Sequence, residues 1–152
     1  MEVGHMSGIK KILLATDGSE GTRHAIDYTL NLAKMCGAQV TALFVVDQIP
    51  LQDVPADSSI VFSVHLLLEN EGKKAVNDIK EAGQKSGVEV ATMVVEGSPA
   101  KKIVEVAADY DLLVVGTIGR SGLSHLLIGS VAERVVRYAP CPVLVVRAKR
   151  GP

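Results

Sequence analysis

Short apolar runs rich in Val, Ile and Leu alternate along this chain with segments in which apolar residues repeat every three or four positions. The runs have the length of strands and are apolar on both faces, whereas the intervening period is typical of helices with one buried face. Strands separated by helices pair in parallel, and strands that are apolar on both faces are covered on both sides of the sheet. The sequence therefore predicts an α/β fold with the order βαβαβαβαβ. We expect strands at residues 10–16, 39–46, 87–95, 111–116 and 141–147, and helices at residues 19–36, 65–86, 98–109 and 130–139.

The boundaries between these elements carry their own signals. In a capping box, a helix N-cap side chain and a Glu three residues later each bond a backbone N–H group. Asp17 followed by Glu20, and Ser130 followed by Glu133, have this spacing, so we expect Asp17 and Ser130 to cap two helices. Segment 47–63 holds two prolines and scattered acids, and we expect a long connection without secondary structure there.

Length, charge and cysteine content limit the possible functions. At 152 residues the chain has the size of one domain, to which we assign residues 9–147, with residues 1–8 and 148–152 as terminal tails. The formal net charge of −1 gives no field that attracts nucleic acid. No apolar stretch approaches the roughly 20 residues of a membrane span. From the charge we expect no nucleic acid as a partner, and from the short apolar runs we expect no membrane. Cys36 and Cys141 lack the spacing of a metal site, so we expect reduced thiols in a cytoplasmic protein.

The segment GTIGRSGLSHLLIGS, residues 116–130, follows the fourth expected strand and is unusually rich in glycine. Glycine lets the backbone approach a ligand closely because no Cβ stands in the way. The segment ends at Gly129-Ser130, where a helix begins, and the unpaired N–H groups and positive dipole of a helix start attract anions. Ligands of open α/β sheets bind at the carboxyl ends of the strands. The segment therefore predicts a phosphate site, although neither G-x-x-x-x-G-K followed by Ser or Thr nor G-x-G-x-x-G occurs in the chain.

The spacing of these glycines resembles that of a known family. Two residues separate Gly116 from Gly119, and nine separate Gly119 from Gly129-Ser130, which matches the G-2x-G-9x-G-(S/T) signature of ATP-binding universal stress proteins. The opening ILLATDGSEGTRHAIDYTLNLAK resembles that family's first strand, Asp-bearing turn and helix. ALFVVD is similar to its second strand, and APCPVLVV to its last. The resemblance covers residues 9–147.

The resemblance implies a single doubly wound sheet of five parallel strands in the order 3-2-1-4-5, so that strands one and four are neighbours. It also implies bound ATP, with AMP or ADP as alternatives, accompanied by Mg²⁺ or Mn²⁺. Asp17 is then expected near the ribose, and the backbone of Val45 near adenine. Ile118 stands where many relatives have a polar residue, which removes one contact to ribose or phosphate. The nucleotide contacts implied by position are Ala15, Thr16, Asp17, Val45, Gly116, Gly119, Arg120, Gly129, Ser130 and Val131.

Three classes of function remain open. We favour an ATP-binding stress-response or signalling protein with little intrinsic hydrolysis. The second class is a slow ATPase or another phosphoryl-transfer enzyme. Its chemistry requires a positioned metal and an oriented nucleophile, whereas the loop offers Arg120 and His125 and no paired carboxylates. The third class is a dimerisation module that binds no nucleotide.

The last strand suggests how the chain assembles. The order implied by the resemblance puts this strand at a sheet edge, where its backbone N–H and C=O groups lack a neighbour. We therefore expect a homodimer in which Val143 to Val146 of two copies pair across a twofold axis. Pro142 has no N–H to donate and limits pairing at the start of the strand.

Overall fold

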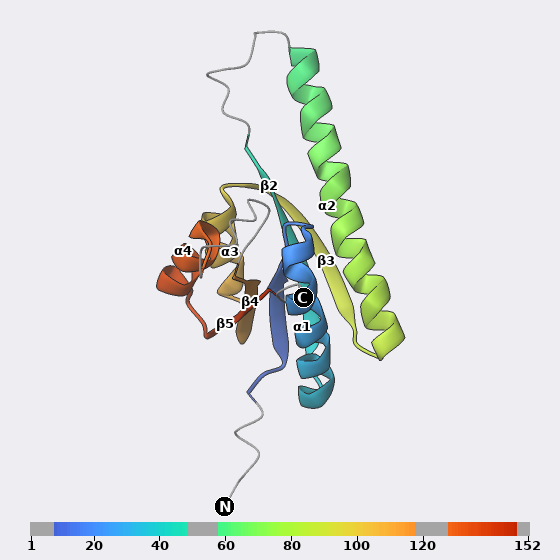
Figure 1. Ribbon diagram of the computed structural model, residues 1–152, viewed down its shortest axis with the longest axis vertical. Helices are drawn as coiled ribbons and strands as arrows, with labels where there is room; N and C mark the ends of the chain where they lie inside the picture. Colours follow the sequence, from blue (N-terminus) through green and yellow to red (C-terminus); the bar gives the residue numbers. More distant parts are fainter. Residues whose placement is uncertain (1–7, 49–57, 118–127, 149–152) are drawn as a thin grey trace, which may run out of the picture.

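The computed structural model describes residues 8–48, 58–117 and 128–148. Its strands form one parallel sheet in the order β3-β2-β1-β4-β5 (Figure 1), so the predicted α/β class and the strand order are confirmed. The elements are β1 (Lys11–Ala15), the 3-10 helix η2 (Glu20–Thr22), α1 (Arg23–Cys36), β2 (Gln39–Asp47), α2 (Ser58–Ser86), β3 (Val90–Gly97), α3 (Pro99–Ala107), β4 (Leu112–Gly116), α4 (Ser130–Tyr138) and β5 (Val143–Val146).

Helices cover both faces of the sheet, with α1 and α2 on one face and α3 and α4 on the other (Figure 1). Successive side chains of a strand point to opposite faces, so β1 contributes to two separate hydrophobic clusters. Ile12 and Leu14 pack under α1 and α2, whereas Leu13 packs with residues of α3 and α4. Burial on both faces is the reason why the strands read as continuous apolar runs.

Two glycines allow α2 to lie close against the sheet. A Cβ added at Gly72 would lie 2.6 Å from Cδ1 of Phe44, and one added at Gly83 would lie 2.9 Å from the carbonyl oxygen of Val88. A Cβ atom essentially never lies within 3.0 Å of such a neighbour, so a side chain at either place would push α2 outward. The glycines therefore set the depth of α2, and with it the packing around the carboxyl end of β2.

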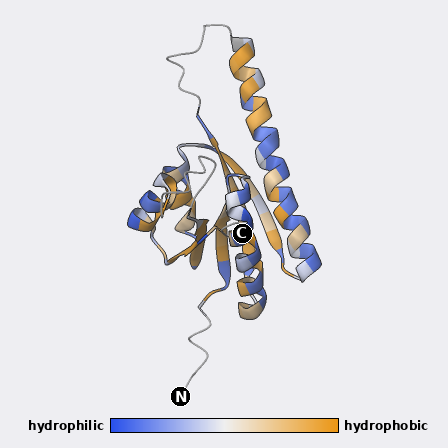
Figure 2. Cartoon of the chain, viewed as in Figure 1, coloured by the Kyte–Doolittle hydropathy of each residue, from blue (hydrophilic) through white to orange (hydrophobic). Residues whose placement is uncertain are grey.

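The first turns of α2 correct the sequence prediction. Residues 58–63, expected in a connection without secondary structure, are helical, and residues 49–57 lie outside the described part of the chain. The prediction was wrong because this part of α2 extends beyond the sheet (Figure 1) and lacks a single buried stripe. Ile60, Phe62 and Leu67 are all exposed, and Figure 2 shows this half of α2 as strongly apolar. Neither α2 nor another helix among the described residues is apolar over a sufficient length to span a membrane.

Both predicted helix caps are also wrong. The N-cap of η2 is Ser19, and Asp17 instead closes a turn, because its carboxylate accepts a hydrogen bond from the Ser19 N–H at 2.9 Å. The N-cap of α4 is Gly129, which has extended backbone at φ −78° and ψ 165°. Ser130 is therefore the first helical residue, and its own N–H group belongs to the open first turn of the helix.

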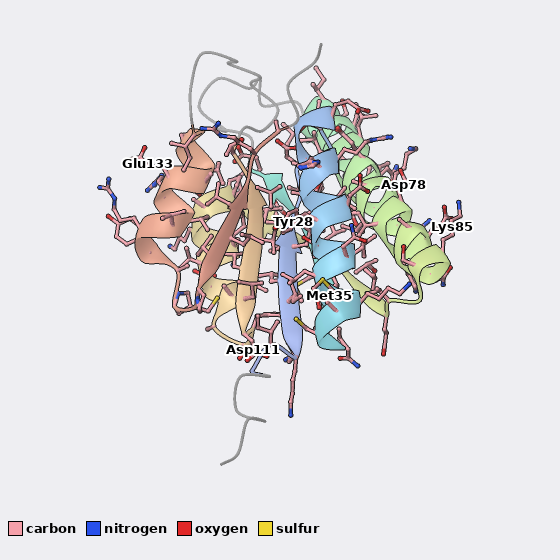
Figure 3. All side chains as sticks on the ribbon, turned by 60° about the horizontal axis from the view of Figure 1, so that its bottom comes forward. Tyr28, Met35, Asp78, Lys85, Asp111 and Glu133 are labelled. Atoms are coloured by element: carbon pink, nitrogen blue, oxygen red, sulfur yellow. The ribbon has the colours of Figure 1, made fainter. Side chains whose placement is uncertain are left out.

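At the amino ends of the strands, a carboxylate holds two strands together. The Asp111 carboxylate, just before β4, accepts hydrogen bonds from the backbone N–H groups of Lys10 and Lys11, both at 2.9 Å (Figure 3). These bonds keep the pKa of Asp111 below its usual value, because they stabilise the charged carboxylate. These bonds tie the starts of β1 and β4 together. The pocket lies at the other ends of the strands, their carboxyl ends.

Candidate functional site

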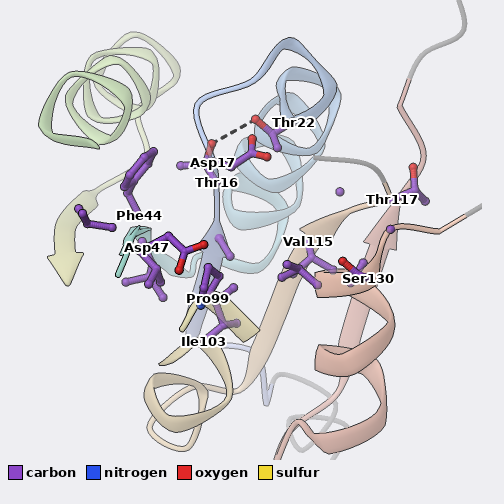
Figure 4. A pocket seen from close by; sticks show the side chains of 18 of the residues that line it. Thr16, Asp17, Thr22, Phe44, Asp47, Pro99, Ile103, Val115, Thr117 and Ser130 are labelled. Atoms are coloured by element: carbon purple, nitrogen blue, oxygen red, sulfur yellow. Dashed lines mark hydrogen bonds between the residues drawn. The ribbon is translucent and has the colours of Figure 1, made fainter. Parts of the chain in front are cut away.

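A pocket of about 330 Å³ lies at the carboxyl ends of β1, β2 and β4 (Figure 4). After β1 the chain continues to β2 and β3 on one side, whereas β4 and β5 lie on the other side of β1. The connections that follow β1 and β4 therefore leave toward opposite faces and open a crevice between them. This is the place where open α/β sheets bind ligands, and the volume lies at the lower end of the range for small-molecule sites.

The structure brings together most of the residues predicted for the site. Gly119 and Arg120, as well as Ile118, lie outside the described residues. The other eight predicted residues all line the pocket: Ala15, Thr16, Asp17, Val45, Gly116, Gly129, Ser130 and Val131.

The pocket also contains residues that the sequence analysis did not identify. Asp47 carried a usable signal, because it is the first charged residue after an apolar strand and so falls at the carboxyl edge of the sheet. Phe44 reaches the pocket from β2, and the others reach it from turns and helices whose positions depend on packing. These additional residues include Thr22, Phe44, Leu68, Pro99, Ile103 and Thr117.

A chain of hydroxyl groups shapes the turn after β1. The Thr22 hydroxyl donates to the Ser19 carbonyl at 2.8 Å, so its single hydrogen is used. The Thr16 hydroxyl, 3.1 Å away (Figure 4), must therefore donate to Thr22, and it accepts from the Gly18 N–H at 3.1 Å. Gly18 has a φ of 79°, which favours glycine. These bonds fix the turn that presents Asp17 to the pocket.

Beside this turn, β2 runs on after its pairing with β1 has ended. The ladder between them closes with the bond from the Thr16 N–H to the Leu43 carbonyl at 2.9 Å, whereas β2 remains paired with β3 as far as Asp47. In a parallel ladder, alternate residues direct their N–H and C=O groups to alternate sides of the strand. Leu43 bonds toward β1, so Val45 directs a donor and an acceptor to the same side, into the pocket.

The start of α4 forms the other wall. Gly129 donates its N–H to the Thr117 carbonyl, which holds the two ends of the glycine-rich segment together. The first helical bond runs from the Glu133 N–H to the Gly129 carbonyl at 3.0 Å. The N–H groups of Ser130 and Val131 therefore have no partner within the helix, and with the helix dipole they form a site suited to an anion.

The pocket is polarised from one end to the other. Its charged side chains, among the described lining residues, are the carboxylates of Asp17 and Asp47, which come from the turn after β1 and the end of β2. The positive pole is the start of α4, beyond the end of β4. A ligand that fits this field carries hydrogen-bond donors toward β1 and β2 and negative charge toward α4.

Comparisons with known proteins agree with this architecture. A universal stress protein from Methanocaldococcus jannaschii, MJ0531, is 44% identical over 140 residues, which cover 91% of this chain and 82% of the relative. The solved structure of universal stress protein UspA from Lactobacillus plantarum superposes with a TM-score of 0.83 at 27% identity, covering 91% of this chain and 97% of that one. A universal stress protein solved in complex with cAMP has a TM-score of 0.68 at 25% identity, with 93% of this chain and 99% of that one covered. The universal stress protein family matches residues 8–147, and the chain therefore belongs to this family.

Proposed function

We propose that the pocket binds an adenine nucleotide, with ATP as its ligand, and that the protein is a nucleotide-dependent module of a stress response or a signalling pathway. The observation that carries the proposal is the polarity of the pocket. Apolar side chains of Leu68, Pro99 and Ile103 surround the end of β2, where Val45 offers its backbone groups. The start of α4 lies two strands away, about 10 Å at the usual strand spacing. A nucleotide has the same division into a flat apolar base and an anionic phosphate end.

This division supports one orientation of the nucleotide. The base lies in the apolar end, with its polar edge on the Val45 N–H and C=O groups. The ribose lies over the turn of Thr16 and Asp17, where a carboxylate can accept hydrogen bonds from sugar hydroxyls. The phosphates lie at the N–H groups of Ser130 and Val131. The solved relative that contains cAMP supports this class of ligand for the family.

The remaining phosphate contacts come from the glycine signature. Gly116 lines the pocket at the end of β4, and Gly119 and Arg120 complete the set proposed from sequence. Mg²⁺ or Mn²⁺ accompanies ATP and is held through phosphate oxygens and water rather than through a protein cage. AMP and ADP share the base and ribose contacts, so they bind in the same orientation with fewer phosphate interactions.

We also propose that intrinsic hydrolysis is slow. Backbone N–H groups and a helix dipole stabilise the phosphates of the bound ground state. Groups that bind the ground state and the transition state equally give affinity without rate. Asp17 lies at the ribose end, so Arg120 and His125 are the candidate groups of the loop that could act on developing charge. ATP is therefore a bound signal in this proposal.

Assembly as a homodimer completes the proposal. β5 is an edge strand of the sheet, and its residues Val143 to Val146 are apolar. A second copy can pair with this edge across a twofold axis and satisfy its open backbone groups. The thiols of Cys36 and Cys141 are free in the structure, and we propose the cytoplasm as the compartment that keeps them reduced.

The experiment that tests nucleotide binding is mass spectrometry of gently purified protein, followed by titration calorimetry with ATP and Mg²⁺. We expect a co-purified adenine nucleotide and saturable binding of ATP. Ligand at 100 times its dissociation constant stabilises a protein by about 2.7 kcal/mol, so thermal denaturation supplies a second readout. A protein that neither carries a nucleotide nor responds to millimolar ATP would support the dimerisation module instead. Phosphate release at about 1 s⁻¹ or faster, lost in Gly129→Val, would support the ATPase.

A further inference from the structure

The carboxylate of Asp47 occupies a place in the pocket that neither the glycine signature nor the phosphate site explains. Asp47 is the last residue of β2, and its side chain lines the pocket. Figure 4 shows it between the turn of Thr16 and Asp17 and the start of α3 at Pro99. It therefore lies at the end of the pocket where the base of a nucleotide is proposed to bind, away from the phosphates.

Asp47 continues the polar edge of Val45. The two residues are separated by one position, so the backbone groups of both point toward the β1 side of β2. Their side chains both lie on the face of the sheet that α3 covers, roughly 6–7 Å apart along the strand. A nucleobase in the pocket therefore meets three groups in succession: the Val45 N–H as a donor, the Val45 C=O as an acceptor, and the Asp47 carboxylate as a second acceptor. A carboxylate accepts hydrogen bonds only, as long as it is ionised.

A purine with an amino group at position 6 complements this series. Adenine presents the acceptor N1 beside the amino group N6, which has two hydrogens to donate. The N–H of Val45 fits N1, the C=O of Val45 takes one N6 hydrogen, and Asp47 takes the other. A purine with a carbonyl at position 6, such as hypoxanthine or guanine, presents O6 in the same place. That oxygen would face two acceptors without a hydrogen between them.

We propose that Asp47 is a specificity-determining residue, which accepts a hydrogen bond from the exocyclic amino group of the base and selects 6-amino over 6-oxo purine nucleotides. This inference rests on the proposed nucleotide site and specifies how that site chooses its base.

A purely structural role for Asp47 makes a different prediction. Asp47 pairs with Gly97 in the sheet, and α3 begins two residues later, at Pro99. A carboxylate near the start of a helix is stabilised by the helix dipole. If that were its only role, replacing Asp47 would change the stability of the protein and would alter the affinities for all purine nucleotides by the same factor.

The experiment compares ATP with inosine triphosphate, which has a carbonyl at position 6, by titration calorimetry of the full chain. The variants are Asp47→Asn, whose amide can donate to O6, and Asp47→Ala, which removes the group. The matched control is Asp78→Asn on the outer side of α2 (Figure 3), where Asp78 pairs with Lys74 at 3.2 Å. Circular dichroism verifies the fold of each variant.

We expect the wild type and Asp78→Asn to prefer ATP by more than about tenfold, because a lost or opposed hydrogen bond to a charged group has at least this effect. In Asp47→Asn the preference should fall by about tenfold or more, and Asp47→Ala should lie between the two. Val45 is unchanged in every variant, so the change in the ratio measures Asp47 alone.

An ATP preference that is the same in the wild type and in both Asp47 variants would overturn the inference, even if their melting temperatures differ. A wild type that binds both nucleotides equally would overturn it as well, while leaving the nucleotide site in place. A wild type that binds neither nucleotide would overturn the proposed function together with this inference.

Discussion

The hydroxyl of Thr22 ties η2 to the end of β1, and Thr22→Val removes it while keeping the shape of the side chain. Thr22 is 5% exposed, donates to the Ser19 carbonyl at 2.8 Å and shares a hydrogen bond with the Thr16 hydroxyl at 3.1 Å. In the variant, the Ser19 carbonyl keeps only the hydrogen bond from the Thr22 backbone N–H at 3.1 Å, and the Thr16 hydroxyl loses its acceptor. The change therefore tests whether the turn beneath the pocket depends on the hydroxyl chain.

The size of the effect follows from these two bonds. Each intramolecular hydrogen bond contributes roughly 0.5–1.5 kcal/mol net, so losing both costs about 1–3 kcal/mol. The additional buried methyl group returns up to about 0.8 kcal/mol. We expect the free energy of unfolding to fall by about 1–2 kcal/mol. For a domain of this size, that corresponds to a melting temperature roughly 2–8 °C lower.

Thermal and guanidinium denaturation followed by circular dichroism measure this difference, and Thr29→Val is the matched control. Thr29 is fully buried, at 0% exposure, and its hydroxyl donates to the Ala25 carbonyl at 2.7 Å. Thr29→Val loses this one bond, whereas Thr22→Val loses two. The loss of roughly 0.5–1.5 kcal/mol is offset by the added methyl group, which contributes about 0.8 kcal/mol, so we expect a change within about 0.7 kcal/mol. A Thr22→Val protein as stable as the wild type, or a Thr29→Val protein destabilised to the same extent, would refute the reasoning.

Three further predictions concern the phosphate site, the sheet edge and the carboxylate at the amino ends of the strands. Gly129→Val should abolish ATP binding in calorimetry, because the added side chain fills the space before α4. The circular dichroism spectrum should be unchanged, since φ at this position is −78°, a value that Val also adopts. Retained affinity would place the phosphates elsewhere. Val145→Lys should shift the protein to monomers in light scattering, because it puts a charge on the apolar edge strand; a wild type that is already monomeric at tens of micromolar would contradict the dimer. Asp111→Asn should lower stability at neutral pH, because the pKa of Asp111 is depressed in the folded protein by its bonds to the N–H groups of Lys10 and Lys11. The deficit should be complete above about pH 4, the unfolded value, and should vanish as the pH falls through the folded pKa, so a deficit that is constant down to pH 2 would argue against this role.

Local sequence patterns predict the α/β class and the approximate place of every strand. A strand covered on both faces needs a continuous apolar run, and such a run can be recognised from a few consecutive residues. The boundaries of helices and strands were harder to predict from the sequence, because they depend on contacts with neighbouring elements. β3 was expected at 87–95 and extends over Val90–Gly97, because its end is set by pairing with β2 as far as Asp47. The first turns of α2 were missed because Ile60 and Phe62 are exposed and follow no buried stripe.

For the pocket, the sequence was sufficient to identify those residues that lie within a single turn of the chain. Gly116, Gly129 and Asp17 mark the ends of strands and the start of a helix, which the local pattern of the sequence indicates. Which other groups meet these residues depends on how the helices pack on the sheet. Leu68 reaches the pocket because glycines let α2 approach the sheet, and Ile103 because α3 crosses the opposite face. The direction of the Val45 backbone and the place of Asp47 follow from where β1 stops pairing with β2. These relations join residues far apart in the chain, and they arise from packing and strand register, which no local pattern encodes.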